Sequence, residues 1–125
     1  MKFLIVDDSV TMRRILANSL QDMGFQEFEV AKNGVEALSA FDGSIDFVIT
    51  DWNMPNMGGL DFAKALRERE DGQDVPILLL TRERAKAELR QVAQAGVENT
   101  LIKPFTPRVL QDKIHQVLGA SAGAA

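Results

Sequence analysis

The sequence predicts a doubly wound α/β fold with five parallel strands and five helices. Five short runs rich in apolar residues recur along the chain, and the continuous run over residues 2–6 is typical of a strand buried on both faces of a parallel sheet. Segments with helical spacing of apolar residues separate these runs, which favours right-handed crossover connections. The 125 residues fit one domain, and 46% apolar with 26% charged residues indicates an ordinary globular composition.

The first predicted strand covers residues 2–6 and ends at Asp7 and Asp8. Either Asp8 or Ser9 can cap the next helix, and apolar residues at helical spacing continue it until Gly24: Met12, Ile15, Leu16, Leu20 and Met23. A second strand is predicted over residues 28–31. Asn33 then provides a cap with Glu36 three positions later, and three apolar residues are expected to form a short helix: Val35, Leu38 and Phe41.

The third predicted strand covers residues 47–50, and a loop over residues 53–59 leads into the next helix. That helix is closed by Asp71-Gly72 and is expected to turn three residues inward: Leu60, Ala63 and Leu66. The fourth strand is predicted over residues 76–80. Gly96 ends the next helix, whose apolar stripe is narrow: Leu89, Val92 and Ala93. The fifth strand covers residues 100–102. A cap at Thr106 and proline at the first helical position begin the last helix, with three core residues: Leu110, Ile114 and Val117.

This pattern predicts a domain over residues 1–118 and a flexible tail over residues 119–125, where only Gly, Ala and Ser remain. A net charge of −4 and a pI of about 4.9 argue against a nucleic-acid-binding module. With no cysteine, disulfides and thiolate metal sites are excluded. The apolar runs are too short to span a bilayer, and Met1-Lys2 leads directly into a strand, so we expect a cytoplasmic monomer without membrane insertion.

Residues suited to phosphate or metal chemistry stand at the ends of four of the five predicted strands: Asp7 and Asp8, Asp51, Thr81 and Lys103. Each alone has an ordinary explanation as a helix cap, a turn residue or a surface lysine. A parallel sheet, however, brings the carboxyl ends of its strands to one edge, where ligands bind at the point of reversed strand order. The sequence therefore predicts three carboxylates and one ammonium group side by side.

Three neighbouring carboxylates repel one another, and a hard divalent cation compensates that repulsion. Mg²⁺ prefers oxygen ligands, often one or two carboxylates and a phosphate oxygen. We expect Asp8 and Asp51 to bind it directly and Asp7 to act through water. Lys103 and the Thr81 hydroxyl would contact the other phosphoryl oxygens, so Asp51 is the predicted nucleophile.

Several motifs of the chain resemble those of one known protein family: Val6-Asp7-Asp8, Thr11-Met12-Arg13-Arg14, Asp51-Trp52-Asn53-Met54-Pro55-Asn56-Met57, Thr81, Ala95-Gly96 and Lys103-Pro104-Phe105. Over residues 2–118 the chain resembles the response-regulator receiver domains of two-component systems, particularly the CheY-like chemotaxis regulators. The resemblance implies the flavodoxin-like strand order 2-1-3-4-5 and Mg²⁺-dependent phosphoryl transfer from a histidine kinase to Asp51. It also implies that the Asn53 backbone carbonyl completes the metal site and that the Lys103-Pro104 bond is cis.

The chain departs from the family pattern at two switch positions. Receivers usually carry a small residue after the strand-four hydroxyl, whereas Arg82 stands here. It either contacts the phosphoryl group or is a solvated arginine at a helix start. Thr100 replaces the rotating aromatic residue of CheY-like receivers, so no ring can report phosphorylation there. Glu83 corresponds to an acid near the family's site, although a solvated acid opposite Arg82 explains it equally well.

The leading interpretation is a phosphorylation switch that binds a target protein through its fourth helix, fifth strand and fifth helix, with contacts at Lys86, Leu89, Ile102 and Lys113. A phosphate sink for a shared kinase is an alternative. A Mg²⁺-dependent phosphohydrolase would need a second acid where Asn53 stands, so we expect a signalling domain instead of a turnover enzyme. A flavodoxin-like cofactor binder would need a Gly-rich or Ser/Thr-rich phosphate loop where Asp7 and Asp8 stand.

Overall fold

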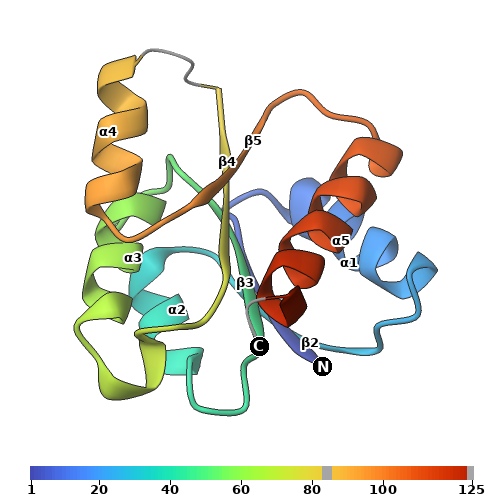
Figure 1. The fold of residues 1–125 in the computed structure, drawn as a ribbon, viewed down its shortest axis with the longest axis horizontal. Coiled ribbons are helices and arrows are strands. Elements are labelled where there is room, and N and C mark those ends of the chain that lie inside the picture. The colour runs from blue at the N-terminus through green and yellow to red at the C-terminus, as the bar shows by residue number, and fades with distance from the viewer. Residues whose placement is uncertain (83–85, 124–125) are drawn as a thin grey trace.

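The computed structural model describes residues 1–82 and 86–123 and contains the predicted five-stranded parallel sheet, in the order β2-β1-β3-β4-β5 (Figure 1). The strands are β1 (Lys2–Val6), β2 (Glu27–Ala31), β3 (Phe47–Asp51), β4 (Ile77–Thr81) and β5 (Asn99–Ile102). The helices are α1 (Val10–Asp22), α2 (Gly34–Ala40), α3 (Gly59–Arg67), α4 (Lys86–Gln94) and α5 (Pro107–Gly123), with a short 3₁₀ turn, η1 (Glu70–Gly72).

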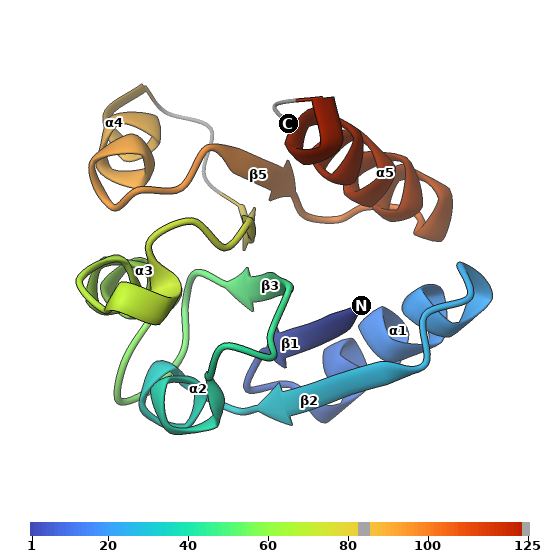
Figure 2. The same ribbon diagram turned by 60° about the horizontal axis from the view of Figure 1, so that its bottom comes forward.

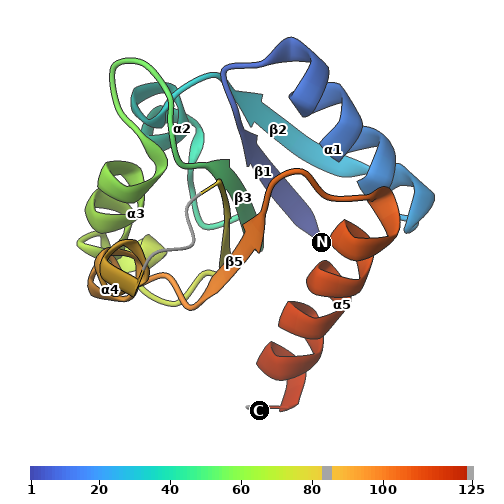
Figure 3. The ribbon, with the colours of Figure 1, turned by 90° about the horizontal axis from the view of Figure 1, so that it is seen from above.

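Helices cover both faces of the sheet, with α2, α3 and α4 on one side and α1 and α5 on the other (Figures 2 and 3). Successive residues of a strand point to opposite faces, which explains why the inner strands β1, β3 and β4 are buried along almost their whole length. The edge strand β2 instead carries the exposed Glu27 and Glu29. In β1, Leu4 and Val6 pack in the core cluster on the α2–α4 side. Phe3 and Ile5 pack in the cluster on the α1 and α5 side. Each of these side chains contributes about 1.5–3 kcal/mol by leaving water.

The strand order reverses between β1 and β3, which lie side by side in parallel register with Val6 opposite Thr50. The next residues along these two strands are Asp7 and Asp51. At the same edge, β3 pairs with β4 so that Asp51 stands opposite Leu80. The carboxyl ends of β4 and β5 point to the top of Figure 1, and the N-terminus lies at the other end of the sheet.

Three predicted helix caps are confirmed by their hydrogen bonds. At the start of α5 the backbone N–H of Val109 donates to Thr106 Oγ1 at 3.2 Å. The backbone N–H of Met12 donates to Ser9 Oγ at 3.1 Å, and the N–H of Glu36 donates to Asn33 Oδ1 at 2.9 Å. Glu36 in turn accepts the backbone N–H of Lys32 at 3.2 Å, which satisfies another amide at the start of α2. These bonds orient the segments that follow β1 and β2.

Three residues of the predicted apolar patterns lie outside the buried stripes of their helices. Ile15 and Val35 are 40% and 52% exposed, and Ala93 is exposed beside the buried Val92. In each helix other positions of the 3.6-residue period face the sheet, so these residues lie outside the buried stripe. α5 continues to Gly123, so residues 119–123 are helical; the mobility of the tail stays a prediction, and residues 124–125 lie outside the described part. Among the described residues, none belongs to a helix long and apolar enough to cross a membrane.

Candidate functional site

Three carboxylates meet at the point where the strand order reverses. Asp7 and Asp8 follow β1, Asp51 ends β3, and one ligand oxygen of each lies within 4.8 Å of those of the other two. Asp7 and Asp51 are buried, and Asp8 is exposed to solvent. They line a cleft of about 350 Å³ together with five other residues: Ser9, Met12, Asn53, Arg82 and Lys103. The structure thus brings together the carboxylates that the sequence analysis placed at one edge.

Lys103 lies directly against the carboxylate of Asp51. Its Nζ donates a hydrogen bond to Asp51 Oδ1 at 2.9 Å and lies 3.7 Å from Asp7 Oδ2. The side chain comes from the end of β5, where the backbone N–H of Lys103 donates to the carbonyl of Thr81 at 2.8 Å. The expected cis Lys103-Pro104 bond is present. Lys103 therefore supplies one positive charge between two of the three carboxylates.

The backbone around Asp51 is held by several hydrogen bonds. The N–H of Trp52 donates to Asp51 Oδ1 at 2.9 Å, and the Thr50 hydroxyl donates to the carbonyl of Asp51 at 3.0 Å. The loop that follows returns to the strand end, where the N–H of Gly59 donates to the carbonyl of Trp52 at 2.8 Å. With Oδ1 engaged by Lys103 and Trp52, Oδ2 is the oxygen of Asp51 that no hydrogen bond holds within the described residues.

One carboxylate oxygen of Asp7 is buried without a hydrogen bond among the described residues. Its Oδ1 accepts the N–H of Ser9 at 2.8 Å, but Oδ2 is buried and has no hydrogen-bond partner in residues 1–82 and 86–123. The Lys103 ammonium is too distant for a hydrogen bond to Oδ2, although it still attracts it. Burial raises the pKa of Asp7, and the charges of Asp51 and Asp8 add to the increase, while the Ser9 N–H and Lys103 oppose it.

A divalent cation fits this orphaned oxygen and its neighbours. Three carboxylates near one another are a suitable donor set for Mg²⁺, which prefers oxygen ligands. Asn53, whose backbone carbonyl is the further ligand implied by the family resemblance, lines the same cleft. Asp7, Asp8, Asp51 and Asn53 are therefore the residues that would hold the ion.

The remaining predicted site residues occupy different surroundings. Thr81 is buried at the end of β4, and it is not among the residues that line the cleft. Arg82 is exposed and lines the cleft, whereas Thr100 is half-buried in β5. Pro104 is exposed beside Lys103. Glu83 lies outside the described residues.

Arg13 also supports the site, although the sequence pattern assigned no role to it. Arg13 of α1 donates from Nη1 to the backbone carbonyl of Asp7 at 2.6 Å, which ties the helix to the loop that carries the acids. Its position one turn into the helix after that loop is the signal that could have identified it, because such a side chain can reach back to the preceding strand end.

The chain was compared with known families and proteins. The family model of the response regulator receiver domain matches residues 3–115. Chemotaxis protein CheY1 of Helicobacter pylori is 46% identical over 123 residues, which cover 97% of this chain and 99% of that protein. The chemotaxis protein CheY homolog of Campylobacter jejuni is 46% identical over 125 residues, which cover 98% and 96% of the two chains.

Solved structures agree with these relatives. The chemotaxis response regulator CheY4 of Vibrio cholerae matches with a TM-score of 0.86 at 38% identity, covering 93% of this chain and 97% of that one. A family model that spans most of the chain, relatives similar over nearly their whole length and the same fold all agree. CheY-type receivers are signalling regulators, not metabolic enzymes. The chain thus belongs to the response regulator receiver domain family and is CheY-like.

Proposed function

We propose that the protein is a chemotaxis response regulator in which Asp51 accepts a phosphoryl group from a phosphohistidine of a histidine kinase. The observation that carries this proposal is the contact of Lys103 Nζ with Asp51 Oδ1 at 2.9 Å, inside a cluster of three carboxylates. The names of the relatives, which are chemotaxis proteins, support the pathway.

The transfer is a substitution at phosphorus. A carboxylate oxygen of Asp51 forms a bond to phosphorus, the P–N bond of the donor breaks, and its electron pair returns to the imidazole nitrogen. Lys103 contacts an oxygen of the transferred group and neutralises part of its charge. Bound Mg²⁺ would offset the carboxylate charges and withdraw charge from the phosphoryl oxygens. The chain's own contribution is therefore positioning and charge neutralisation.

The same contacts offer a route from Asp51 to a target protein. Lys103 directly follows β5, and its backbone is hydrogen-bonded to Thr81 at the end of β4. A phosphoryl group on Asp51 would draw the Lys103 ammonium away from the carboxylate oxygen. This displacement would shift the balance between two arrangements of the β4 and β5 ends, and α4, β5 and α5 would present the altered face to the target.

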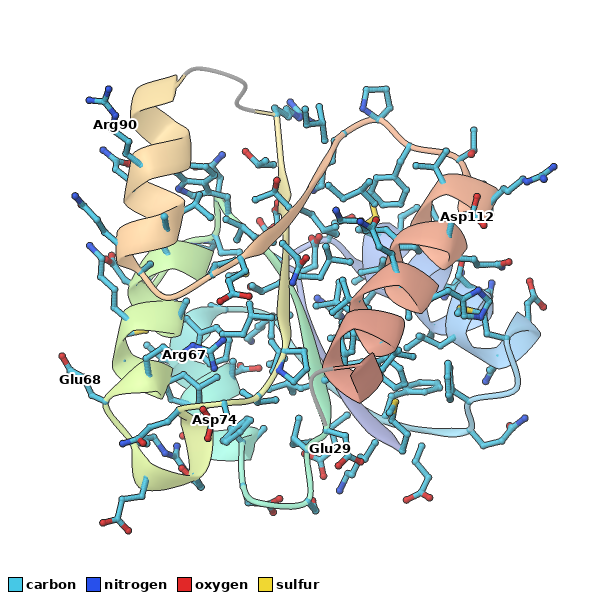
Figure 4. The ribbon with its side chains drawn as sticks, in the orientation of Figure 1. Glu29, Arg67, Glu68, Asp74, Arg90 and Asp112 are labelled. Carbon is cyan, nitrogen blue, oxygen red and sulfur yellow. The ribbon has the colours of Figure 1, made fainter. Side chains whose placement is uncertain are left out.

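Labelling with a phosphodonor tests the acceptor residue. Purified protein is incubated with Mg²⁺ and radiolabelled phosphoramidate, alongside Asp51→Asn and the matched variant Asp112→Asn, which alters an exposed acid of α5 (Figure 4). Wild type and Asp112→Asn should acquire an acid-stable, hydroxylamine-labile phosphate, and Asp51→Asn should acquire none. Full labelling of Asp51→Asn would refute the proposal.

Thr100 favours a second candidate function, a phosphate sink for a shared kinase. The residue is half-buried in β5 and has no ring that could move between two positions. A target that binds the beryllofluoride and Mg²⁺ form of wild type more tightly than the free form would favour the switch. Accelerated loss of phosphate from another receiver of the same kinase, without any such target, would favour the sink.

A further inference from the structure

Arg82 lines both the acidic cleft and a neighbouring groove of the surface. It is the first residue after β4 and lines the acidic cleft together with Asp51 and Lys103. It also lines a neighbouring groove of about 460 Å³, whose other lining residues are mostly apolar: Met12, Ile15, Lys103, Pro104 and Phe105. The hydrogen bond from the backbone N–H of Lys103 to the carbonyl of Thr81 joins the strand ends that carry Lys103 and Arg82. Arg82 therefore borders both the groove and the cleft.

The balance of charges in the cleft favours a second cationic side chain beside Lys103. Asp7, Asp8 and Asp51 face only two cationic side chains among the lining residues, Lys103 and Arg82. A phosphoryl group brings the charge on Asp51 to about −2, and one divalent cation adds two positive charges. With Arg82 counted, the loaded cleft is close to neutral. Without it, about one negative charge remains beside the phosphoryl group.

The chemistry of arginine suits this place. A guanidinium stays protonated, is planar and can give two parallel hydrogen bonds to phosphoryl oxygens. Its methylene stem can lie along an apolar surface while the charged group reaches a polar one. The mostly apolar groove offers such a surface, and the cleft beside it holds the acceptor carboxylate.

We propose that Arg82 is a further phosphoryl-binding residue beside Lys103. Its guanidinium contacts the phosphoryl group at the mouth of the cleft and retains that group on Asp51. The inference rests on the proposed function, because it requires Asp51 to carry the phosphoryl group. It assigns to Arg82 a direct contact that a merely solvated arginine would lack.

Beryllofluoride serves as the probe, titrated at saturating Mg²⁺ and followed by the fluorescence of Trp52, which adjoins Asp51. Arg82→Ala should raise the half-saturating concentration about tenfold, which corresponds to one charge-assisted hydrogen bond. Arg82→Lys should restore most of the affinity. The matched variant Arg90→Ala removes an exposed cation from the outer side of α4 and should behave as wild type (Figure 4). The loss in Arg82→Ala should shrink as salt rises, because screening weakens the contact.

A second measurement follows the decay of labelled phosphate after the donor is removed, which should be several-fold faster in Arg82→Ala than in wild type. Equal affinity and equal decay in Arg82→Ala and wild type, both labelled on Asp51, would overturn the role of Arg82 alone. Labelling that persists in Asp51→Asn, or wild type that takes no label, would overturn the proposed function as well. An Arg82→Lys variant as weak as Arg82→Ala would contradict a contact based on charge.

Discussion

Replacing Gly59 by alanine should destabilise the fold by forcing apart two backbone segments of the site. A Cβ on Gly59 would lie 2.1 Å from the backbone oxygen of Asp51 and 3.0 Å from Leu79 Cδ1. Real Cβ atoms essentially never approach closer than 3.0 Å, so the start of α3 and the end of β3 would have to separate by about 1 Å. Backbone atoms on both sides leave no rotamer that relieves the clash. The expected loss of unfolding free energy is about 1–3 kcal/mol.

Equilibrium urea unfolding, followed by circular dichroism, measures this loss as a lower midpoint. In thermal unfolding the same loss should lower Tm by about 4–12 °C, because Tm falls by about 4 °C per kcal/mol in a domain of this size. Gly43→Ala is the matched control, because no atom lies within 4 Å of its Cβ position. That variant should be neutral or stabilised by up to about 1 kcal/mol. The reasoning is refuted if Gly59→Ala unfolds at the wild-type midpoint.

Three further predictions concern charges and caps. Burial raises the pKa of the Asp7 carboxyl in the folded state above its usual 3.8, so the folded state binds the carboxyl proton more tightly than the unfolded state does. The free energy of unfolding of wild type therefore falls as the pH rises from the unfolded-state pKa through the folded-state pKa. In metal-free buffer the stability of Asp7→Asn relative to wild type should therefore increase from pH 3.5 to pH 7 in urea unfolding, and a constant difference would contradict this. Arg67→Met removes hydrogen bonds at 2.9 Å to two backbone carbonyls and should cost about 1–3 kcal/mol in the same assay, whereas Arg90→Met should cost almost nothing (Figure 4). Asn33→Ala deletes the cap of α2 and should lower the urea midpoint by the equivalent of about 1 kcal/mol at an unchanged m-value; an unchanged midpoint would count against the cap.

Much of the fold could be predicted because its parallel sheet is covered on both faces. The inner strands of such a sheet are buried on both faces, so they appear in the sequence as continuous apolar runs such as residues 3–6 and 77–80. Their ends are equally visible, because polar residues replace the apolar ones where a strand reaches the edge. Helix caps were predictable for a local reason, since Ser9 and Asn33 bond to amides only three residues away.

Features that depend on neighbouring elements could not be predicted with the same detail. Val35 belongs to an apolar pattern, yet Gly34 and Ala37 are the residues that α2 buries, and only the packing partner decides which stripe faces inward. The contact from Arg13 to the carbonyl of Asp7 likewise depends on how α1 returns across the end of β1. Spacing shows that Arg13 can reach back to the strand end, but only the packing of α1 decides that the contact forms.

The sequence by itself determined which residues of this protein could act: carboxylates after the first and third strands, a hydroxyl after the fourth and a lysine after the fifth. Only the tertiary structure decided how they meet. Lys103 is 52 positions from Asp51 in the chain, and its Nζ still reaches Oδ1 at 2.9 Å, while Asp7 Oδ2 is left buried without a hydrogen bond in the described residues. The reason is that local patterns specify strands and caps, whereas strand order and side-chain desolvation arise from long-range packing.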